Sequence, residues 1–130
     1  MPVLEYVDPI DLLTALSGSL QHAYLGVGNG RRPVFASEAF CSLSGYTMEE
    51  LLALESTAVF TPPEDKVQSA NALNGALSGG DPIRRRRELV HRDGRLIAVE
   101  ATAQLLPLRG GQRIVLTEWW PLAASHEAAA

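Results

Sequence analysis

The stretch ELVHRDGRLIAVEATAQL, residues 88–105, consists of two alternating segments joined by a turn. From Ile97 to Leu105 an apolar side chain falls on every second position, which is the period of a strand with one buried face. Asp93-Gly94 separates this segment from residues 88–92, and glycine tolerates the positive φ angle that a tight hairpin requires. The stretch therefore predicts two antiparallel strands joined by a hairpin.

Turn signals on both sides extend this hairpin into a larger sheet. Gly110-Gly111 precedes a third strand over residues 113–120. Nearer the N-terminus, Asn29-Gly30 separates two short apolar runs, a strong hairpin signal. Pro33 lacks an amide donor, so the second of these runs is expected to lie at a sheet edge or to begin there. The sequence thus predicts two strands, then a helical region, then three strands.

Residues 37–78 show an interrupted helical pattern. Gly45 ends one helix, and Thr47 with Glu50 fits a capping box that starts the next. Residues 66–77 place apolar side chains at helical spacing. Ahead of the sheet, residues 8–20 repeat leucine on one face and predict a short amphipathic helix.

Composition and charge exclude several classes of protein. The 130 residues are 46% hydrophobic and 20% charged, which indicates one globular domain. The net charge of -4 argues against general nucleic-acid binding. One cysteine cannot form an internal disulfide, and the three scattered histidines do not complete a zinc cluster. No apolar run reaches the roughly 18 residues that span a bilayer. We expect a cytoplasmic protein without a metal, a membrane anchor or a nucleic-acid partner.

Four short segments, in this order, resemble a PAS domain, a sensory and interaction module. They are VFASEAF (34–40), SGYT with EELL (44–47 and 49–52), PED (63–65) and HRDGR (91–95). The resemblance covers about residues 20–120 and implies an α+β PAS fold. In that fold a five-stranded antiparallel sheet, with elements in the order β-β-α-α-α-β-β-β, carries short helices on one face.

The resemblance divides the chain into three parts and departs from the family at two places: at Ser37, and at Thr117-Glu118-Trp119-Trp120, which stands where the family commonly closes the domain with Asp-Ile-Thr. Residues 1–20 are expected to form a flanking helix, residues 21–121 the PAS domain and residues 122–130 a tail. Ser37 stands where the family commonly has asparagine after the second strand.

The resemblance also implies a pocket between sheet and helices, which either holds a small ligand or is packed shut. The candidate lining residues, which equally suit a closed core, are Phe60, Val67, Leu73, Leu77, Leu89, Ile97, Val99 and Ala101. The cofactor is unknown. Blue-light members use a cysteine in the segment that residues 55–60 occupy here without one, and Cys41 lies earlier. Haem-binding members commonly use a histidine on the long helix, and residues 66–77 contain none.

Four consecutive arginines, residues 84–87, open the strand before the hairpin. Arg85 and Arg87 share strand parity with Leu89 and are directed to the same face. This pair is a candidate for contact with an anionic ligand or an acidic partner, because guanidinium groups bind carboxylates and phosphates in a bidentate manner. The alternative is that all four arginines are solvated and paired with nearby acids.

An interface is better supported by the sequence than catalysis. In the family, the flanking helix commonly lies on the outer sheet face of its own or of a partner chain, and we expect a homodimer. The candidate interface residues are Leu12, Leu13, Leu16, Leu20, Trp119 and Trp120. The two tryptophans have opposite strand parity, so one is expected to face outward, where tryptophan often marks an interface. A kinase or regulator is an expected signalling partner.

No catalytic motif stands in the sequence, and we expect a protein that is not an enzyme. The chain has no phosphate-binding Gly-Lys-Ser/Thr loop and no Gly-x-Ser-x-Gly elbow. The alternative from another class is a small cone-shaped enzyme or carrier resembling the ketosteroid-isomerase-like fold. That alternative requires a buried carboxylate facing a large cavity.

Overall fold

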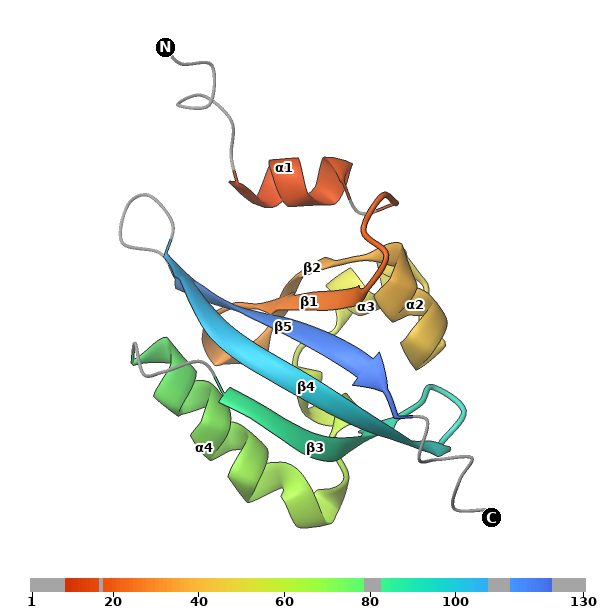
Figure 1. The fold of residues 1–130 in the computed structure, drawn as a ribbon, viewed down its shortest axis with the longest axis vertical. Helices are drawn as coiled ribbons and strands as arrows, with labels where there is room; N and C mark the ends of the chain where they lie inside the picture. Colours follow the sequence, from red (N-terminus) through yellow and green to blue (C-terminus); the bar gives the residue numbers. More distant parts are fainter. Residues whose placement is uncertain (1–8, 17, 79–82, 108–112, 123–130) are drawn as a thin grey trace.

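A five-stranded antiparallel sheet forms the centre of the computed structural model, which describes residues 9–16, 18–78, 83–107 and 113–122 (Figure 1). Its strands stand in the spatial order β2-β1-β5-β4-β3. They are β1 (Ala23–Val27), β2 (Pro33–Ala36), β3 (Ile83–Val90), β4 (Leu96–Pro107) and β5 (Arg113–Pro121). Every neighbouring pair is antiparallel, and β2 and β3 are the two edges. The α+β fold and the order of elements predicted from the sequence are confirmed.

Both hairpins within the described residues form where turn residues predicted them. Gly94 adopts a φ of 95° between β3 and β4, and the His91 amide donates to the Arg95 carbonyl at 2.8 Å. Gly30 adopts a φ of 71° between β1 and β2, within the short 3-10 helix η2 (Asn29–Arg31). The expected turn at Gly110-Gly111 lies outside the described residues.

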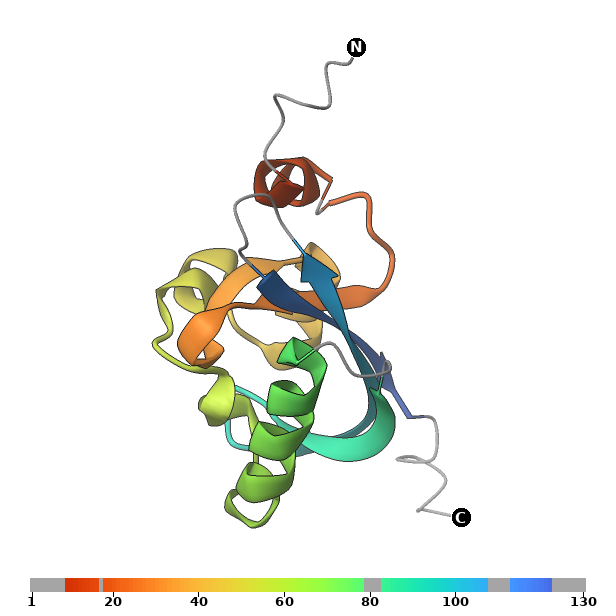
Figure 2. The same ribbon diagram turned by 90° about the vertical axis from the view of Figure 1, so that its left-hand side faces the viewer.

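Short helices cover one face of the sheet, here called the inner face (Figure 2). They are α2 (Glu38–Ser44), α3 (Met48–Ala53), the 3-10 turns η3 (Thr57–Phe60) and η4 (Pro63–Asp65), and α4 (Lys66–Leu77). The remaining helix, α1 (Pro9–Ala15), contacts β2, and its Leu13 lines a groove on the opposite, outer face. Helix α1 ends at Ala15, before the residue 20 that the leucine spacing predicted, because Gly18 and Ser19 form a turn.

Local hydrogen bonds explain where the helices begin and end. The Thr47 side chain and the Glu50 side chain each accept a backbone amide of the other residue, which is the predicted capping box. The Ser37 hydroxyl accepts from the Phe40 and Tyr24 amides and donates to the His22 carbonyl. Serine therefore serves as the N-cap of α2. Gly45 ends α2 with a φ of 85°.

An aromatic cluster holds the inner helices against the sheet. Phe40 meets Phe60 edge to face at 5.5 Å and Trp119 at 5.6 Å, measured between ring centroids. Tyr46 also meets Phe60 edge to face, with ring centroids 5.5 Å apart. Aromatic pairs in this geometry add to the stability that burial of their apolar area already supplies. The cluster fixes the position of η3 and therefore one wall of the cavity described next.

Candidate functional site

Two small adjoining cavities lie between α4 and the inner face of the sheet, with volumes of about 50 and 60 Å³. They share the wall formed by Ser69 and Leu73 of α4, Arg87 of β3, and Thr117 and Trp119 of β5. The walls combine apolar surface with buried guanidinium and hydroxyl groups. The space is therefore small and chemically mixed, unlike the dry apolar cavities of a simple core.

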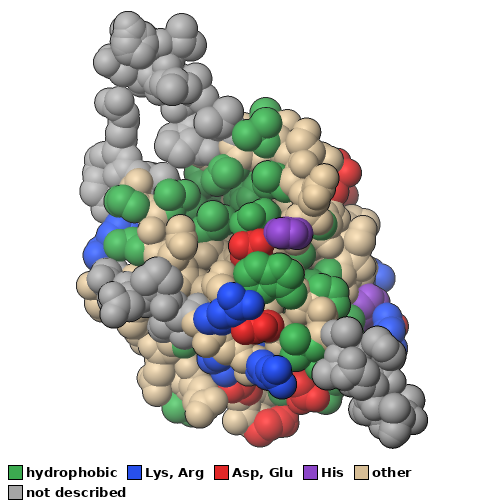
Figure 3. Space-filling view, in the orientation of Figure 1, with side chains coloured by type: hydrophobic (Ala, Val, Ile, Leu, Met, Phe, Trp, Pro, Cys, Tyr) green, Lys and Arg blue, Asp and Glu red, His purple; other side chains and the backbone are tan. Residues whose placement is uncertain are grey.

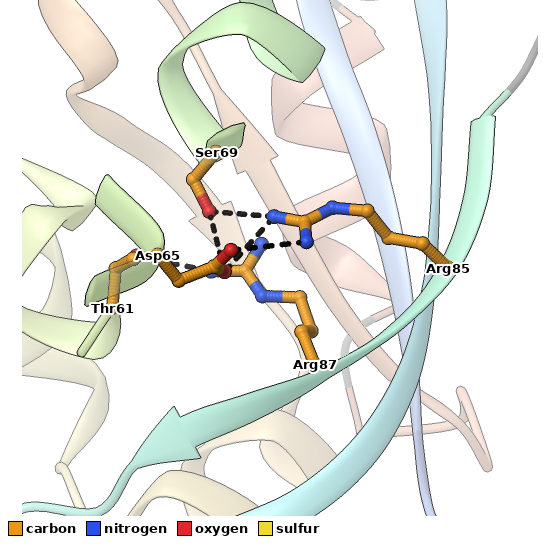
Figure 4. Close-up of polar contacts among 5 residues, drawn as sticks. All are labelled: Thr61, Asp65, Ser69, Arg85 and Arg87. Atoms are coloured by element: carbon orange, nitrogen blue, oxygen red, sulfur yellow. Dashed lines mark hydrogen bonds and ion pairs between the residues drawn. The ribbon is translucent and has the colours of Figure 1, made fainter. Parts of the chain in front are cut away.

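Arg85, which lines the second cavity, is bound in a network with Asp65 and Ser69 (Figure 4). Its Nη1 and Nη2 donate to the two carboxylate oxygens of Asp65 at 3.2 and 3.0 Å. Its Nη2 also donates to the Ser69 hydroxyl at 2.8 Å, and that hydroxyl donates to Asp65 at 3.2 Å. The side chains of Arg85 and Asp65 are only 24% and 17% exposed. This bidentate pair is satisfied without any ligand.

Burial and ion pairing act in opposite directions on the Asp65 carboxyl. Burial raises its pKa, whereas the hydrogen bonds and positive charge of Arg85, with a smaller contribution from Arg87, lower it. The pairing prevails, so the pKa of Asp65 lies below its ordinary value of 3.8. Asp65 is therefore ionised at neutral pH and serves as the acceptor for Arg85.

Arg87 lies two residues further along the same face, without an acidic partner of its own among the described residues. Its Nη2 donates to the Thr61 hydroxyl at 3.0 Å, and its guanidinium carbon lies 4.8 Å from the centroid of the Trp119 ring. Its buried Nε has no hydrogen-bond partner in the described part of the chain. Burial, with the nearby charges of Arg85 and Arg31, lowers the pKa of Arg87 to about 10, so the guanidinium remains charged at neutral pH.

Arg31 also lines the first cavity, and it comes from the turn between β1 and β2. Its φ of 63° is the only positive φ at a non-glycine position among the described residues. Its Nε is buried and, within the same residues, has no hydrogen-bond partner. Two arginines from different elements therefore line one cavity, and each has a buried Nε without a hydrogen-bond partner among the described residues.

The candidate pocket residues from the sequence fall into four groups. Phe60, Leu73 and Ala101 line the two cavities. Leu89 and Val99 are fully buried core residues, with Ile97 packed against them. The Leu77 side chain lies outside the described part of the structure. Val67 is 74% exposed, so its expected place on the pocket wall is wrong.

The error at Val67 has a physical reason. Helix α4 turns Ser69, Leu73 and Ala76 towards the sheet, and Val67 lies on the opposite side of the helix. Ser69 faces inward, although it is polar, because Arg85 and Asp65 satisfy its hydroxyl. The sequence reasoning placed the most apolar face inward and so missed Ser69.

The sequence reasoning also missed several other lining residues: Arg31, Thr57, Thr61, Thr117 and Trp119. Strand parity could have indicated two of them. Thr117 and Trp119 alternate with the outward residues of β5, and the Trp119 indole donates to the Thr117 hydroxyl at 2.8 Å. Trp119 is only 4% exposed, so its expected place in a dimer interface is wrong.

The residues considered for cofactor chemistry are engaged elsewhere. Cys41 packs on the edge of the core, where burial and the charge of Glu38 raise the pKa of its thiol. His22 pairs with Glu118 at 2.6 Å, and the His91 ring accepts the Asp93 amide at 3.1 Å. In the described part of the chain, no group of three metal-binding side chains is close enough to hold an ion.

The outer face carries an apolar groove beside a charged region (Figure 3). The groove has a volume of about 220 Å³ and is lined by Leu13, Leu20, Tyr24, Phe35 and Leu116. Of the other interface candidates, Leu16 is 44% exposed and the Leu12 side chain lies outside the description.

The charged region of the outer face surrounds the second tryptophan of β5. Trp120 is half-buried, with the Arg84 guanidinium 5.2 Å above its ring and His22 at its edge. Arg84 in turn pairs with Glu100. The hydrogen bond and charge of Arg84 hold the pKa of Glu100 below its usual value. Glu100 is therefore an ionised surface group and not the buried acid of a cone-shaped enzyme.

Comparison with known proteins identifies the fold of this arrangement. The family model described as PAS fold matches residues 33–117. A domain of a sensory box sensor histidine kinase/response regulator from Geobacter sulfurreducens is 28% identical, with a TM-score of 0.67, over 83% of this chain and 90% of that one. A PAS domain from Colwellia psychrerythraea is 12% identical, with a TM-score of 0.75, over 90% and 99%.

A third solved structure shows the same likeness of fold. The PAS domain of an HTR-like protein from Haloarcula marismortui is 21% identical, with a TM-score of 0.65, over 86% of this chain and 90% of that one. The comparison with curated proteins finds no match. The expected alternative, a ketosteroid-isomerase-like fold, is wrong. None of the described helices has the length and apolar character needed to cross a membrane.

Proposed function

The chain belongs to the PAS fold family, whose members are sensory modules of signal transduction, and we propose that it senses through its inner cavities and signals through its outer face. In this proposal it acts without catalysis of its own, in the cytoplasm, as a homodimer that contacts a kinase or regulator. The observation that carries the proposal is that one strand, β5, lines both the first inner cavity and the apolar groove on the outer face.

Strand β5 supplies alternate residues to both surfaces. Thr117 and Trp119 line the inner cavities, whereas Leu116 lines the outer groove and Trp120 lies beside the outer charges. Successive side chains of a strand point to opposite faces, so a shift of β5 moves both sets together. A change in the inner cavities that shifts β5 would therefore also move Leu116 and Trp120 on the outer face.

We assign the outer face to a second copy of the chain. Helix α1 does not fill the apolar groove, and Leu16 next to it remains exposed. The same face carries arginines on β3 and the acids Glu100 and Glu118 on neighbouring strands. A two-fold interface brings a surface against itself, which suits a face that carries both charges.

Light scattering across a range of concentrations tests the dimer. The wild-type chain is expected to show the dimer mass, and Leu116→Glu the monomer mass, because the substitution places a charge on the groove floor. Trp120→Ala is expected to weaken the dimer less. Val67→Glu, the same kind of change on exposed α4, is the matched control and keeps the dimer mass.

Two outcomes would contradict the assignment. One is a wild-type chain that stays monomeric at the highest concentration reached. The other is a dimer that Leu116→Glu leaves intact while circular dichroism shows the variant folded. If the chain stays monomeric by itself and gains mass only when a kinase or regulator is added, the outer face would be assigned to that partner instead of to a second copy.

A further inference from the structure

The inner cavities carry more positive charge than the described residues neutralise. Arg31, Arg85 and Arg87 line them. Among the described residues, Asp65 is the one carboxylate whose charge raises the pKa of Arg87. Both oxygens of Asp65 are taken by Arg85 and Ser69. Arg87 is left with a neutral hydroxyl, that of Thr61, and the Trp119 ring as partners in the described structure.

The unpaired groups converge from two separate elements. Arg31 comes from the β1–β2 turn and Arg87 from the edge strand β3, yet both line the first cavity. The Nε of each is buried and lacks a hydrogen-bond partner among the described residues. Buried N–H groups without partners are rare in folded proteins and cost free energy of folding, more so when they are charged. Both arginines line a cavity that has no carboxylate among its described lining residues, which indicates an acceptor that supplies negative charge.

We propose that the first cavity binds a small organic carboxylate, with Arg31 and Arg87 holding its carboxylate group. Its short apolar part then lies against Trp119, Leu73 and Phe60, which line the same space. The inference rests on the proposed function, because it names the class of ligand that the inner cavities sense.

The walls and the size of the cavities favour a carboxylate over an inorganic anion. A guanidinium group binds carboxylate and phosphate alike through parallel N–H bonds. Phosphate, however, presents polar oxygens in every direction, whereas Trp119, Leu73 and Phe60 form an apolar part of the wall. Of the hydroxyls that line the same cavity, those of Thr61, Ser69 and Thr117 are already hydrogen-bonded within the protein. Cavities of about 50 and 60 Å³ admit a chain of a few carbons and exclude a flavin or a haem at their present size.

Water in the cavity would bring no negative charge to Arg87, and Asp65, whose charge acts on Arg87, is already paired with Arg85. A carboxylate supplies both hydrogen-bond acceptors and a negative charge. This difference makes the two occupants separable by experiment, because only the carboxylate gives saturable binding that depends on the arginine charge.

Isothermal titration calorimetry of the full chain with sodium propionate at pH 7 tests the proposal. Saturable one-to-one binding is expected for the wild type, together with a higher thermal midpoint. Arg87→Gln is expected to weaken the binding by about tenfold or more, as the loss of a charge-assisted hydrogen bond implies. Arg84→Gln, on the outer face of the same strand, is the matched control and is expected to leave the affinity within about twofold.

Further arms separate the source of the anion. Sodium phosphate and sodium chloride at equal ionic strength are expected to give no saturable binding. Should Arg87→Gln fail to fold, Arg31→Gln gives the same test from the other side of the cavity. The proposal is overturned if propionate does not bind the wild type, if phosphate binds in its place, or if the inner and outer arginine variants bind propionate equally.

The same samples distinguish this proposal from the dimer. If the chain dimerises through Leu116 but does not bind propionate, the ligand proposal is contradicted and the proposed outer interface stands. If the chain is a monomer that binds propionate, the interface is contradicted and the ligand proposal stands. Neither result can be mistaken for the other, because the variants lie on opposite faces of the sheet.

Discussion

The two faces of β3 carry the same side chain in different surroundings. On the outer face, Arg84 and Arg86 are exposed, and Arg84 pairs with Glu100 in contact with water. On the inner face, Arg85 is enclosed with Asp65, whereas Arg87 is enclosed without an acid of its own among the described residues. Exposed pairs contribute little to stability because water and salt screen them. Inner arginines must instead be paired by the fold or by a ligand.

Removal of the inner acid is the change with the largest expected effect. Asp65→Ala leaves Arg85 without its bidentate partner. Among the described residues, it also leaves the three guanidinium groups that line the cavities without a carboxylate. We expect the free energy of unfolding, measured with urea, to fall by about 2 kcal/mol. Glu100→Ala, which removes the acid from the outer pair, is the control and is expected to change stability within experimental error. Equal losses in the two variants would remove the difference between the faces.

Replacement of Arg87, the inner arginine without an acidic partner of its own among the described residues, is expected to have a smaller effect of opposite sign. Folding lowers the pKa of Arg87 to about 10, which means that the folded protein disfavours the charged form. Arg87→Met keeps the packing on Trp119 and removes the charge, so we expect stability in urea to rise by about 1 kcal/mol. Arg86→Met on the exposed outer face is the comparison. A loss of stability in Arg87→Met alone would show that the arginine is a structural group and not one held for a ligand.

The pH dependence of the inner pair gives the smallest expected effect. Pairing with Arg85 holds the pKa of Asp65 below 3.8 in the folded protein. Its contribution to stability is therefore complete above that ordinary value and is lost as the pH falls through the lowered one. The difference in stability between the wild type and Asp65→Asn should narrow on acidification below about pH 4. A constant difference down to the acid limit of folding would show that Asp65 acts through packing instead of charge.

The fold and the facing of β3 were predictable because they follow from short-range patterns. Turn residues predicted the hairpins, and strand parity placed Arg85 and Arg87 on the face of Leu89. The partner of each arginine was not predictable. Asp65 and Ser69 meet Arg85 across 20 and 16 residues of chain, and this depends on how α4 rests on the sheet. Nothing in the sequence indicated that Arg87 would lack an acidic partner among the described residues.

The remaining errors arise where a polar residue is satisfied inside the fold. Ser69 faces inward because of Arg85 and Asp65, and this turns Val67 to the solvent. Arg31 reaches the cavity from a backbone conformation that non-glycine residues rarely adopt. Neither feature leaves a trace in hydrophobic periodicity. The candidate site is thus built mainly from residues that pattern reasoning assigns to the surface.

The most direct test of the inner ligand site observes the arginine Nε–H groups themselves. In nitrogen-15 NMR spectra of the full chain, titration with sodium propionate is expected to shift the Nε–H signals of Arg31 and Arg87 along a saturable curve. The Nε–H signal of Arg84, which already donates to Glu100, is expected to stay in place. If only outer-face arginines respond, or if sodium chloride produces the same shifts, the inner cavities do not hold a carboxylate.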